Sequence, residues 1–311
     1  MNKKNILIVV IFISSVIILS INYYYFLQKN LKDNLIIDIP KNSNLKSISN
    51  ILVENEITTN NIFPYTLSLI LGYEKKLSFG EFLITPNDTL FSTLKKIRNS
   101  ETYNRQITIV EGYEKYNLLE LINKSLLIKD NFKFEEYNLV GETFSYNKYQ
   151  TASEFLKNIN DYINNFLNKR NTLQQYNNNA ILIIGSLVEK EGMNDEDKRL
   201  ISSVIFNRLE KNMKLDIDAS VIFSITEGNY KFDRKLTYDD LKIDSAYNTY
   251  RYKGLPPKPI CIPGLNTLKV VLEKHKSDFF YYFFDENKNS HIFSKNYKEH
   301  LKKLNEYKKN K

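Results

Sequence analysis

A long apolar run near the N-terminus constrains this chain more than any other feature of its sequence. From Ile6 to Leu27 there is no charged residue. A helix of about 22 residues, rising 1.5 Å per residue, is long enough to cross a bilayer core of about 30 Å. The run therefore predicts a membrane-spanning helix at the start of the chain.

The residues on either side of the run predict its orientation. Lys3 and Lys4 precede it, and three tyrosines from Tyr23 to Tyr25 stand near its far end. Positive residues favour the cytoplasmic side, and aromatic residues favour the membrane interface. No small-x-small cleavage site follows, which favours an uncleaved signal anchor over a removed signal peptide. We expect a single-pass protein of the inner (cytoplasmic) membrane with its larger part on the periplasmic side.

Composition narrows the classes of partner and cofactor. Lys and Arg number 44 against 36 Asp and Glu, which gives a net charge of +8. This balance suits anionic surfaces, but no dense basic run or nucleic-acid motif is present, so we expect no nucleic-acid partner. The single Cys261 cannot form an intramolecular disulfide, and the three histidines lack metal-ligand spacing. We therefore expect neither a metal nor a cofactor.

Three segments after the predicted anchor share one pattern. Residues 35–57, 80–99 and 105–126 each have a short β-prone run, a turn and an amphipathic helix signal. Such units are typical of small carbohydrate-binding modules with a β-α-α-β order, although many other α+β domains contain them. The pattern predicts an α+β chain with a first outer domain up to about residue 105. A longer helix is expected after Thr151 or Ser153, either of which can cap it.

The segment "ILIIGSLVEKEG", residues 181–192, places two acids at the end of an apolar helix. Asn177 to Asn179 supply caps for a helix from about Ala180 to Glu191, and Gly192 supplies its end. Two residues apart on a helix, Glu189 and Glu191 point about 200° from each other. A conventional glycosidase needs two carboxyl groups about 5–9.5 Å apart across its substrate. One glutamate that acts alone, first as acid and then as base, fits this pair better.

Glu191 has the more suitable surroundings for a general acid. It continues the apolar stripe of Ile184, Leu187 and Val188 and lies in the last helical turn. Desolvation and the negative end of the helix dipole both raise the pKa of a carboxyl group there. Two solvated glutamates at a helix end remain the alternative interpretation of this stretch.

The C-terminal third contains further local signals. Asn194 is expected to cap a second helix, whose apolar stripe includes Ile201, Val204 and Ile205. Residues 246–252 carry three tyrosines, and a stiff proline-rich loop to residue 264 is expected to be packed through Ile260 and Ile262. Residues 279–284 and 291–294 predict a hairpin, and a charged amphipathic helix is expected after it.

Four stretches in this order resemble the YceG-like family, the membrane-anchored endolytic murein transglycosylases. They are "SLVEKEG", "VIFNRLEKNMKLDIDASVIFSI", "AYNTYRYKGLPPKPICIPG" and "HIFSKNYKEH". The resemblance implies an α+β chain with a cytoplasmic tip and anchor in residues 1–29. It also implies a LysM-like βααβ subdomain in residues 30–105 and a mixed α/β YceG-like catalytic domain in residues 106–311.

The resemblance further implies a lytic transglycosylase. Such an enzyme cleaves the MurNAc–GlcNAc bond within peptidoglycan strands and leaves 1,6-anhydro-MurNAc ends, with one glutamate of the "VEKE" motif as catalyst. We carry that role to Glu191, with Glu189 as the second choice. Peptidoglycan strands are then the substrate, and cell-wall synthesis proteins are conceivable partners. Substrate-binding roles are implied for the other residues that match motif positions: Asn207, Arg208, Asp218, Tyr247, Asn248, Thr249, Tyr250 and His291.

The chain departs from the family pattern at two places. "LVGETFSY", residues 139–146, replaces an expected glutamate-glycine and proline-aspartate pattern, and "LDIDASV" replaces a usual Gln-Thr-Asp-Pro-Thr pattern while keeping Asp218. Two alternatives remain open at this point. One is a muramidase that hydrolyses the same bond, and the other is a non-catalytic scaffold that only binds peptidoglycan.

Overall fold

The computed structural model describes residues 12–16, 20, 32–73 and 75–309. Most of the predicted anchor lies outside these residues, and its described part, residues 12–16 and 20, is helical. None of the helices in the described ranges combines the length and the apolar character needed to cross a membrane.

The chain divides into two compact units. The first contains the described residues up to Arg105 together with Asn147–Tyr149. The second contains Gln106–Tyr146 and the chain from Gln150 onward. Both units combine helices with two-stranded sheets, so the predicted α+β class is confirmed.

The first unit has two strands and three helices. In chain order they are β1 (Leu35–Ile39), α2 (Leu45–Glu54), α3 (Ile62–Ile70), β2 (Gly80–Ile84) and α4 (Leu90–Arg98). The strands pair antiparallel, with Leu35 opposite Ile84 and Ile39 opposite Gly80. Alternate strand residues and one stripe of each of α2 and α4 form the core, including Ile37, Ile39, Ile48, Leu52, Phe82, Ile84, Leu94 and Ile97.

The second unit holds the remaining elements. These are β3 (Arg105–Thr108), α5 (Lys115–Lys124), the 3-10 turn η1 (Phe134–Glu136), β4 (Thr143–Tyr146), α6 (Ala152–Arg170), α7 (Asn178–Glu191), α8 (Asp195–Glu210), α9 (Asp218–Thr226), η2 (Asp240–Lys242), α10 (Leu265–Glu273), β5 (Tyr281–Asp285), β6 (Ser290–Ser294) and α11 (Tyr297–Lys309). Strand β3 pairs with β4, and β5 pairs antiparallel with β6 as the predicted hairpin.

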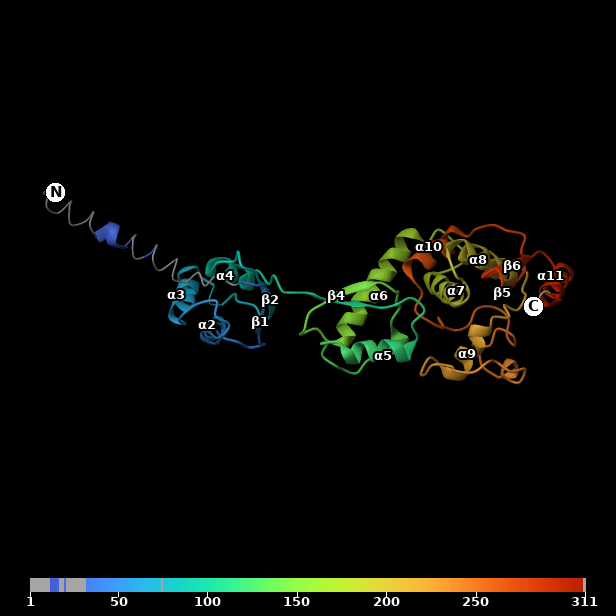
Figure 1. Cartoon of the computed structure of the whole chain (residues 1–311), viewed down its shortest axis with the longest axis horizontal. Helices are drawn as coiled ribbons and strands as arrows, with labels where there is room; N and C mark the ends of the chain where they lie inside the picture. The colour runs from blue at the N-terminus through green and yellow to red at the C-terminus, as the bar shows by residue number, and fades with distance from the viewer. Residues whose placement is uncertain (1–11, 17–19, 21–31, 74, 310–311) are drawn as a thin grey trace. The chain divides into compact units, whose positions relative to one another are not determined.

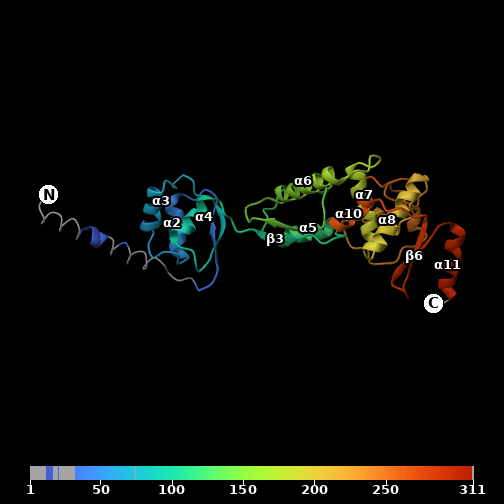
Figure 2. The same cartoon turned by 90° about the horizontal axis from the view of Figure 1, so that it is seen from above.

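Helix α7 is the central element of the second unit. Every residue from Ile181 to Val188 is buried, so the helix is enclosed by other elements instead of having one solvated face. Helices α8, α9 and α10 contact it, and Figure 2 shows α7, α8 and α10 gathered together. A Cβ at Gly185 would lie 2.6 Å from Cδ2 of Leu268, so glycine is required for the close approach of α10.

The capping predictions are largely confirmed. Asn177 caps α7 by accepting from the Ala180 N–H, and Asn194 caps α8 in the same way. Of the two candidates for α6, Thr151 is the cap. Gly192 ends α7, but its φ of −84° is accessible to any residue. The glycine is needed for a different reason, because a Cβ there would lie 2.4 Å from Cγ of Lys198.

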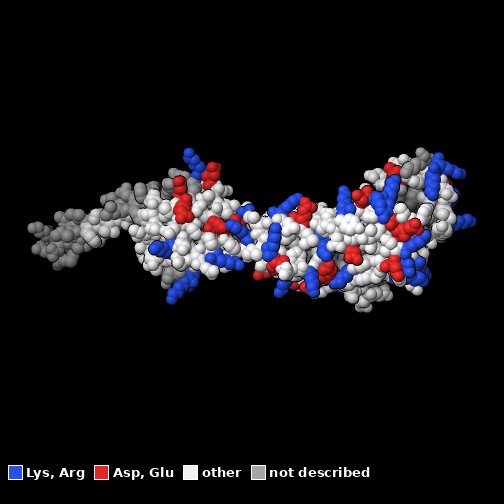
Figure 3. All heavy atoms as spheres, turned by 90° about the horizontal axis from the view of Figure 1, so that it is seen from below, with Lys and Arg blue, Asp and Glu red and all other residues white. Residues whose placement is uncertain are grey.

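The proline-rich loop before α10 is packed, as its apolar residues predicted. Ile260 and Ile262 are buried, and the Ile260 N–H donates to the Ser186 hydroxyl on α7 at 3.0 Å. Basic and acidic side chains are interspersed over the face drawn in Figure 3.

Candidate functional site

Glu191 lies where three elements meet at the C-terminal end of α7. Its Oε2 accepts a hydrogen bond of 3.2 Å from the Tyr282 hydroxyl on β5, and its carboxylate also accepts from the Ala219 N–H. Ala219 belongs to the first turn of α9, whose N–H groups have no partner within the helix. The buried run of α7 therefore carries this acid to a position between a helix N-terminus and a tyrosine.

Burial raises the pKa of Glu191 to about 7, and the nearby negative charge of Asp218 adds to this effect. The hydrogen bonds from Tyr282 and Ala219 act in the opposite direction, since both stabilise the carboxylate. A carboxyl group with a pKa near 7 populates both protonation states near neutral pH. Such a group can give a proton and take one back in the same reaction.

Glu189 has different partners, although it stands only two residues earlier. Its side chain is 6% exposed and forms an ion pair of 2.7 Å with Lys198 on α8. It also accepts from the Gly264 N–H at 2.9 Å and from the Thr267 hydroxyl, at the start of α10. Glu189 thus joins α7, α8 and α10, and the divergent directions predicted for the two acids are confirmed.

Asp218 and Tyr250 form a second pair beside Glu191. The Tyr250 hydroxyl donates to Oδ1 of Asp218 at 2.6 Å. Burial, and then this hydrogen bond, raises the pKa of Tyr250 well above its ordinary value, so the hydroxyl stays protonated. Asp218 is the first residue of α9, where the helix dipole favours a negative charge.

His291 and Asp197 form a buried pair behind Tyr282. Nδ1 of His291 lies 2.8 Å from Oδ2 of Asp197, and each side chain is 7% exposed. The His291 ring meets the edge of the Tyr282 ring with 5.3 Å between centroids. The pair thus supports the tyrosine that contacts Glu191.

Four other motif residues use their side chains to hold backbone. Asn207 donates to the carbonyls of Ser277 and Phe279, and Asn248 donates to those of Leu241 and Ile243. The remaining two are Arg208, which donates to the carbonyls of Lys214, Leu215 and Phe280, and Thr249, which accepts from the Ile217 N–H. Arg208, Asn248 and Thr249 thus hold the segments that carry Asp218 and Tyr250, and Asn207 holds the segment before β5.

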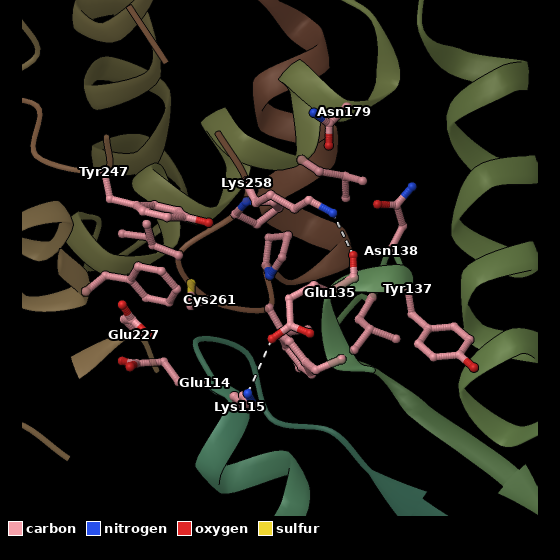
Figure 4. Close-up of a pocket in the computed structure, with 18 of the residues that line it drawn as sticks. Glu114, Lys115, Glu135, Tyr137, Asn138, Asn179, Glu227, Tyr247, Lys258 and Cys261 are labelled. Carbon is pink, nitrogen blue, oxygen red and sulfur yellow. Dashed lines mark hydrogen bonds and ion pairs between the residues drawn. The ribbon is translucent and has the colours of Figure 1, made fainter. Parts of the chain in front are cut away.

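Tyr247 stands apart from Glu191 and lines a cavity of about 350 Å³ (Figure 4). Its ring packs on Phe223 of α9 with 4.7 Å between centroids. Of the eight predicted binding residues, Asp218, Tyr250 and His291 therefore gather near Glu191, while Tyr247 belongs to a neighbouring cavity.

Sequence reasoning missed several residues around the two acids. Tyr282, Asp197, Lys198 and the Ala219 N–H are all parts of the observed arrangement. Tyr282 stands opposite Phe293 in the predicted hairpin, and Phe293 is two residues from His291 and therefore on the same face of the strand. The hairpin register thus carried a signal for Tyr282, whereas nothing local marked the pairing of Lys198 with Glu189.

The two departures from the family pattern have clear positions. Gly141 packs against Glu111, since a Cβ there would lie 3.0 Å from the Glu111 Cα, and its N–H donates to the Pro263 carbonyl at 2.8 Å. In the second departure, Asp216 pairs with Arg208 at 2.9 Å. The first segment therefore contacts the proline-rich loop before α10, and the second is held to α8 just before Asp218.

Comparison with known proteins gives relatives by sequence and a solved structure of similar fold. The chain is 28% identical to the endolytic murein transglycosylase of Bacillus subtilis over 90% of its own length and 86% of that protein. It is 30% identical to an endolytic murein transglycosylase of Streptococcus pneumoniae over 59% of its length, which is 34% of that protein. A YceG-like protein of Listeria monocytogenes, solved by crystallography, aligns with a TM-score of 0.54 at 25% identity, over 88% of this chain and 99% of that chain.

The profile of the YceG-like family matches residues 37–306, which include most of both units and all the residues described around Glu191. The chain belongs to the YceG-like family.

Proposed function

We propose that this chain is a lytic transglycosylase that cleaves the MurNAc–GlcNAc bond within peptidoglycan strands, with Glu191 as its catalytic acid and base. The relatives named as endolytic murein transglycosylases support the substrate and the reaction class. The observation that carries the assignment to this residue is the pKa of Glu191, raised to about 7 between Tyr282 and the start of α9.

The reaction needs one carboxyl group and no water. Protonated Glu191 gives its proton to the glycosidic oxygen as the bond to the anomeric carbon breaks. The 6-hydroxyl oxygen of the same MurNAc then forms a bond to that carbon, and its proton passes to the Glu191 carboxylate. The product is a 1,6-anhydro ring, and the residue regains its starting form. Because the nucleophile belongs to the substrate, the second step is intramolecular and favoured by proximity.

Neighbouring groups position Glu191 and stabilise the developing charge. Tyr282 and the Ala219 N–H hold the carboxylate in one orientation once the proton has left. The negative charge of Asp218 keeps Glu191 protonated before the reaction and then favours the positive charge that develops on the sugar ring. His291 acts as a positioning residue, since its ring packs on Tyr282, and Asp197 holds His291 in place through their buried pair.

Glu189 has no place in this chemistry. Its two oxygens are engaged by Lys198, Gly264 and Thr267, and its side chain is buried. A substrate would have to displace that buried ion pair to reach it, which is unfavourable. The proposal therefore selects Glu191 of the two candidates.

The proposal also includes an anchor and a glycan-binding module. The charge-free run from Ile6 to Leu27 supports a helix in the cytoplasmic membrane with both compact units on its outer side. The order β1-α2-α3-β2 supports a LysM-like role for the first unit, which would then hold the glycan strand. A reporter fused after Lys311 tests the topology, and a signal from the cytoplasm would reject it.

Mass spectrometry of digested cell walls tests the reaction itself. Purified sacculi treated with the full chain in water enriched in oxygen-18 should release anhydro-muropeptides without the label. A reducing end that carries oxygen-18 would identify a muramidase, and intact strands would identify a scaffold that only binds.

A further inference from the structure

The cavity lined by Tyr247 is separate from Glu191. It lies between the start of α5, residues 134–139, the first turns of α7, the end of α9 and residues 258–263 (Figure 4). Leu182 of α7 is in its wall, and Glu191 stands nine residues further along the same helix. At 1.5 Å per residue, the cavity is therefore about 13.5 Å from the acid along the helix axis.

Most charged groups in the wall are already paired. Glu114 forms an ion pair of 2.5 Å with Lys190, and Lys115 forms one of 3.3 Å with Glu135. Within each pair the two charges neutralise each other, so neither pair attracts a charged ligand strongly.

Glu227 and Lys258 are the exceptions. Within the described part of the chain, the Glu227 carboxylate has no hydrogen bond and no ion pair, and its side chain is exposed to the cavity. The Lys258 ammonium donates to the carbonyl of Glu135 at 2.7 Å and has no carboxylate at ion-pair distance among the described residues. Figure 4 shows Glu227 on one side of the cavity and the Lys258 ammonium extended toward the other. The cavity thus offers one negative group and one positive group at separate places, and neither forms an ion pair with a described residue.

Neutral groups complete the lining. The Tyr247 hydroxyl points into the cavity in Figure 4, and no described residue bonds it. Burial, followed by the charges of Glu135 and Glu227, raises the pKa of Tyr247, so it remains a hydrogen-bond donor. The amides of Asn179 and Asn229 are also in the wall and without side-chain partners in the described ranges. Phe223 and Ile260 add apolar surface, which gives the mixed lining of a small-molecule site.

We propose that this cavity binds the free peptide stem of an uncross-linked peptidoglycan strand, with Glu227 on the stem's side-chain ammonium and Lys258 on its terminal carboxylate. The inference rests on the proposed function, because it assumes a peptidoglycan substrate. The sugars of a stem-bearing strand carry no charge, because the lactyl carboxyl of MurNAc is in an amide with the stem, so the sugars would not engage two charges of opposite sign. An uncross-linked stem carries both an ammonium and a carboxylate.

The distance to Glu191 agrees with this occupant. A stem branches from the MurNAc sugar, and an extended peptide spans about 3.3–3.6 Å per residue. Three to four residues therefore cover roughly 13 Å, which is the separation of the cavity from the acid along α7. A cross-link converts the stem ammonium into an amide, so the site would distinguish free strands from strands already joined to the wall.

Binding of a synthetic stem peptide to the full chain tests the proposal without any cleavage. The probe is N-acetyl-L-Ala-γ-D-Glu-L-Lys-D-Ala-D-Ala, whose blocked N-terminus leaves the lysine side chain as its one ammonium group, and it is titrated by ligand-observed NMR up to millimolar concentration. Two derivatives remove one charge each, by acetylation of the lysine side chain or by amidation of the C-terminus. We expect each derivative to bind about two- to fivefold more weakly, as for loss of one partly exposed ion pair. Equal affinities for all three peptides, or no binding by any, would overturn the proposal.

Two variants assign the charges to their residues. For Glu227→Gln we expect the acetylated and free peptides to bind equally, while the effect of amidation persists. For Lys258→Gln we expect the amidated and free peptides to bind equally, while the effect of acetylation persists. Glu120→Gln and Lys124→Gln are matched controls, because this exposed pair on α5 is outside the cavity, and both should retain the full discrimination. Loss of discrimination in the controls, or its retention in both cavity variants, would contradict the assignment.

The outcome is distinguishable from failure of the proposed function. A chain that discriminates the peptides but produces no anhydro ends would leave the cavity assignment intact and reject the transglycosylase. A chain that produces anhydro ends but binds all three peptides equally would reject only the cavity assignment.

Discussion

Replacing each of the two glutamates by glutamine should separate stability from catalysis. In Glu189→Gln the amide keeps the shape and one acceptor oxygen, but Lys198 loses the negative charge beside it. The Lys198 side chain is 10% exposed, and removal of one partner from a buried ion pair costs about 3–5 kcal/mol. Because the amide retains part of the hydrogen bonding, we expect the free energy of unfolding to fall by about 3 kcal/mol, the lower end of this range. For a unit of this size 1 kcal/mol shifts Tm by about 2–4 °C, so Tm should fall by about 6–12 °C.

Glu191→Gln should keep or raise the stability of the fold and lose activity. The pKa of Glu191 rises from 4.5 to about 7 in the folded chain, so the folded state binds more protons than the unfolded state between these values. The free energy of unfolding of the wild type therefore falls as pH rises through that window. An amide does not titrate, so at pH 8 the free energy of unfolding of this variant should exceed that of the wild type by at most about 3 kcal/mol. Its Tm should then be the higher of the two, and the difference should shrink toward pH 5. Activity should fall by about 10²–10⁴-fold, the usual contribution of general acid catalysis.

The assay combines thermal melts at pH 5 and pH 8 with initial cleavage rates on one glycan-strand substrate. Rates are taken well below the lower Tm, so that each variant is folded. Glu120→Gln is the control, because this exposed glutamate has only an i,i+4 pair with Lys124. An inactive Glu189→Gln that melts like the wild type, together with an active Glu191→Gln, would refute the reasoning.

Three further predictions concern the surroundings of the two acids. The cleavage rate should fall above about pH 7, because Glu191 must be protonated at the start, and a flat profile from pH 6 to pH 9 would contradict its role as the acid. Tyr282→Phe removes a hydrogen bond that lowers the pKa of Glu191, so the alkaline limb of the pH–rate profile should move to higher pH with Tm little changed. Gly192→Ala places a methyl group 2.4 Å from Cγ of Lys198, and calorimetry should show a loss of about 1–3 kcal/mol, whereas an unchanged Tm would mean that the α7–α8 turn adapts freely.

Local signals in the sequence predicted the helices around the site well. The bounds of α7 and α8 follow from Asn177 and Asn194, since a capping side chain acts on N–H groups two or three residues away. The position of Glu191 in a desolvated place could be predicted for the same reason, because the apolar stripe belongs to its own helix. These features depend on neighbours in sequence, so the sequence alone contains them.

Long-range contacts were not predictable in this way. Tyr282 is 91 residues from Glu191, and Thr267 is 78 residues from Glu189. No periodicity connects such positions. The motif residues show a further limit, since a motif gives a position but not the direction of a side chain. Asn207 and Arg208 hold backbone carbonyls, whereas Asp218 lies beside the acid.

The return of Asn147–Tyr149 to the first unit ties the order of folding to the order of synthesis. Asp38 on β1 pairs with Lys148 at 2.5 Å and accepts from the Tyr149 hydroxyl at 2.8 Å, across 110 and 111 positions of sequence. When β1 emerges from the ribosome, and later on the far side of any membrane the chain crosses, these partners have not yet arrived. The first unit can collapse around its own core, but it reaches its final set of contacts only after the chain has passed residue 149. Its maturation therefore waits until Gln106–Tyr146, the first part of the second unit, has also been made, and a nascent chain stalled before Lys148 would leave Asp38 without these two partners.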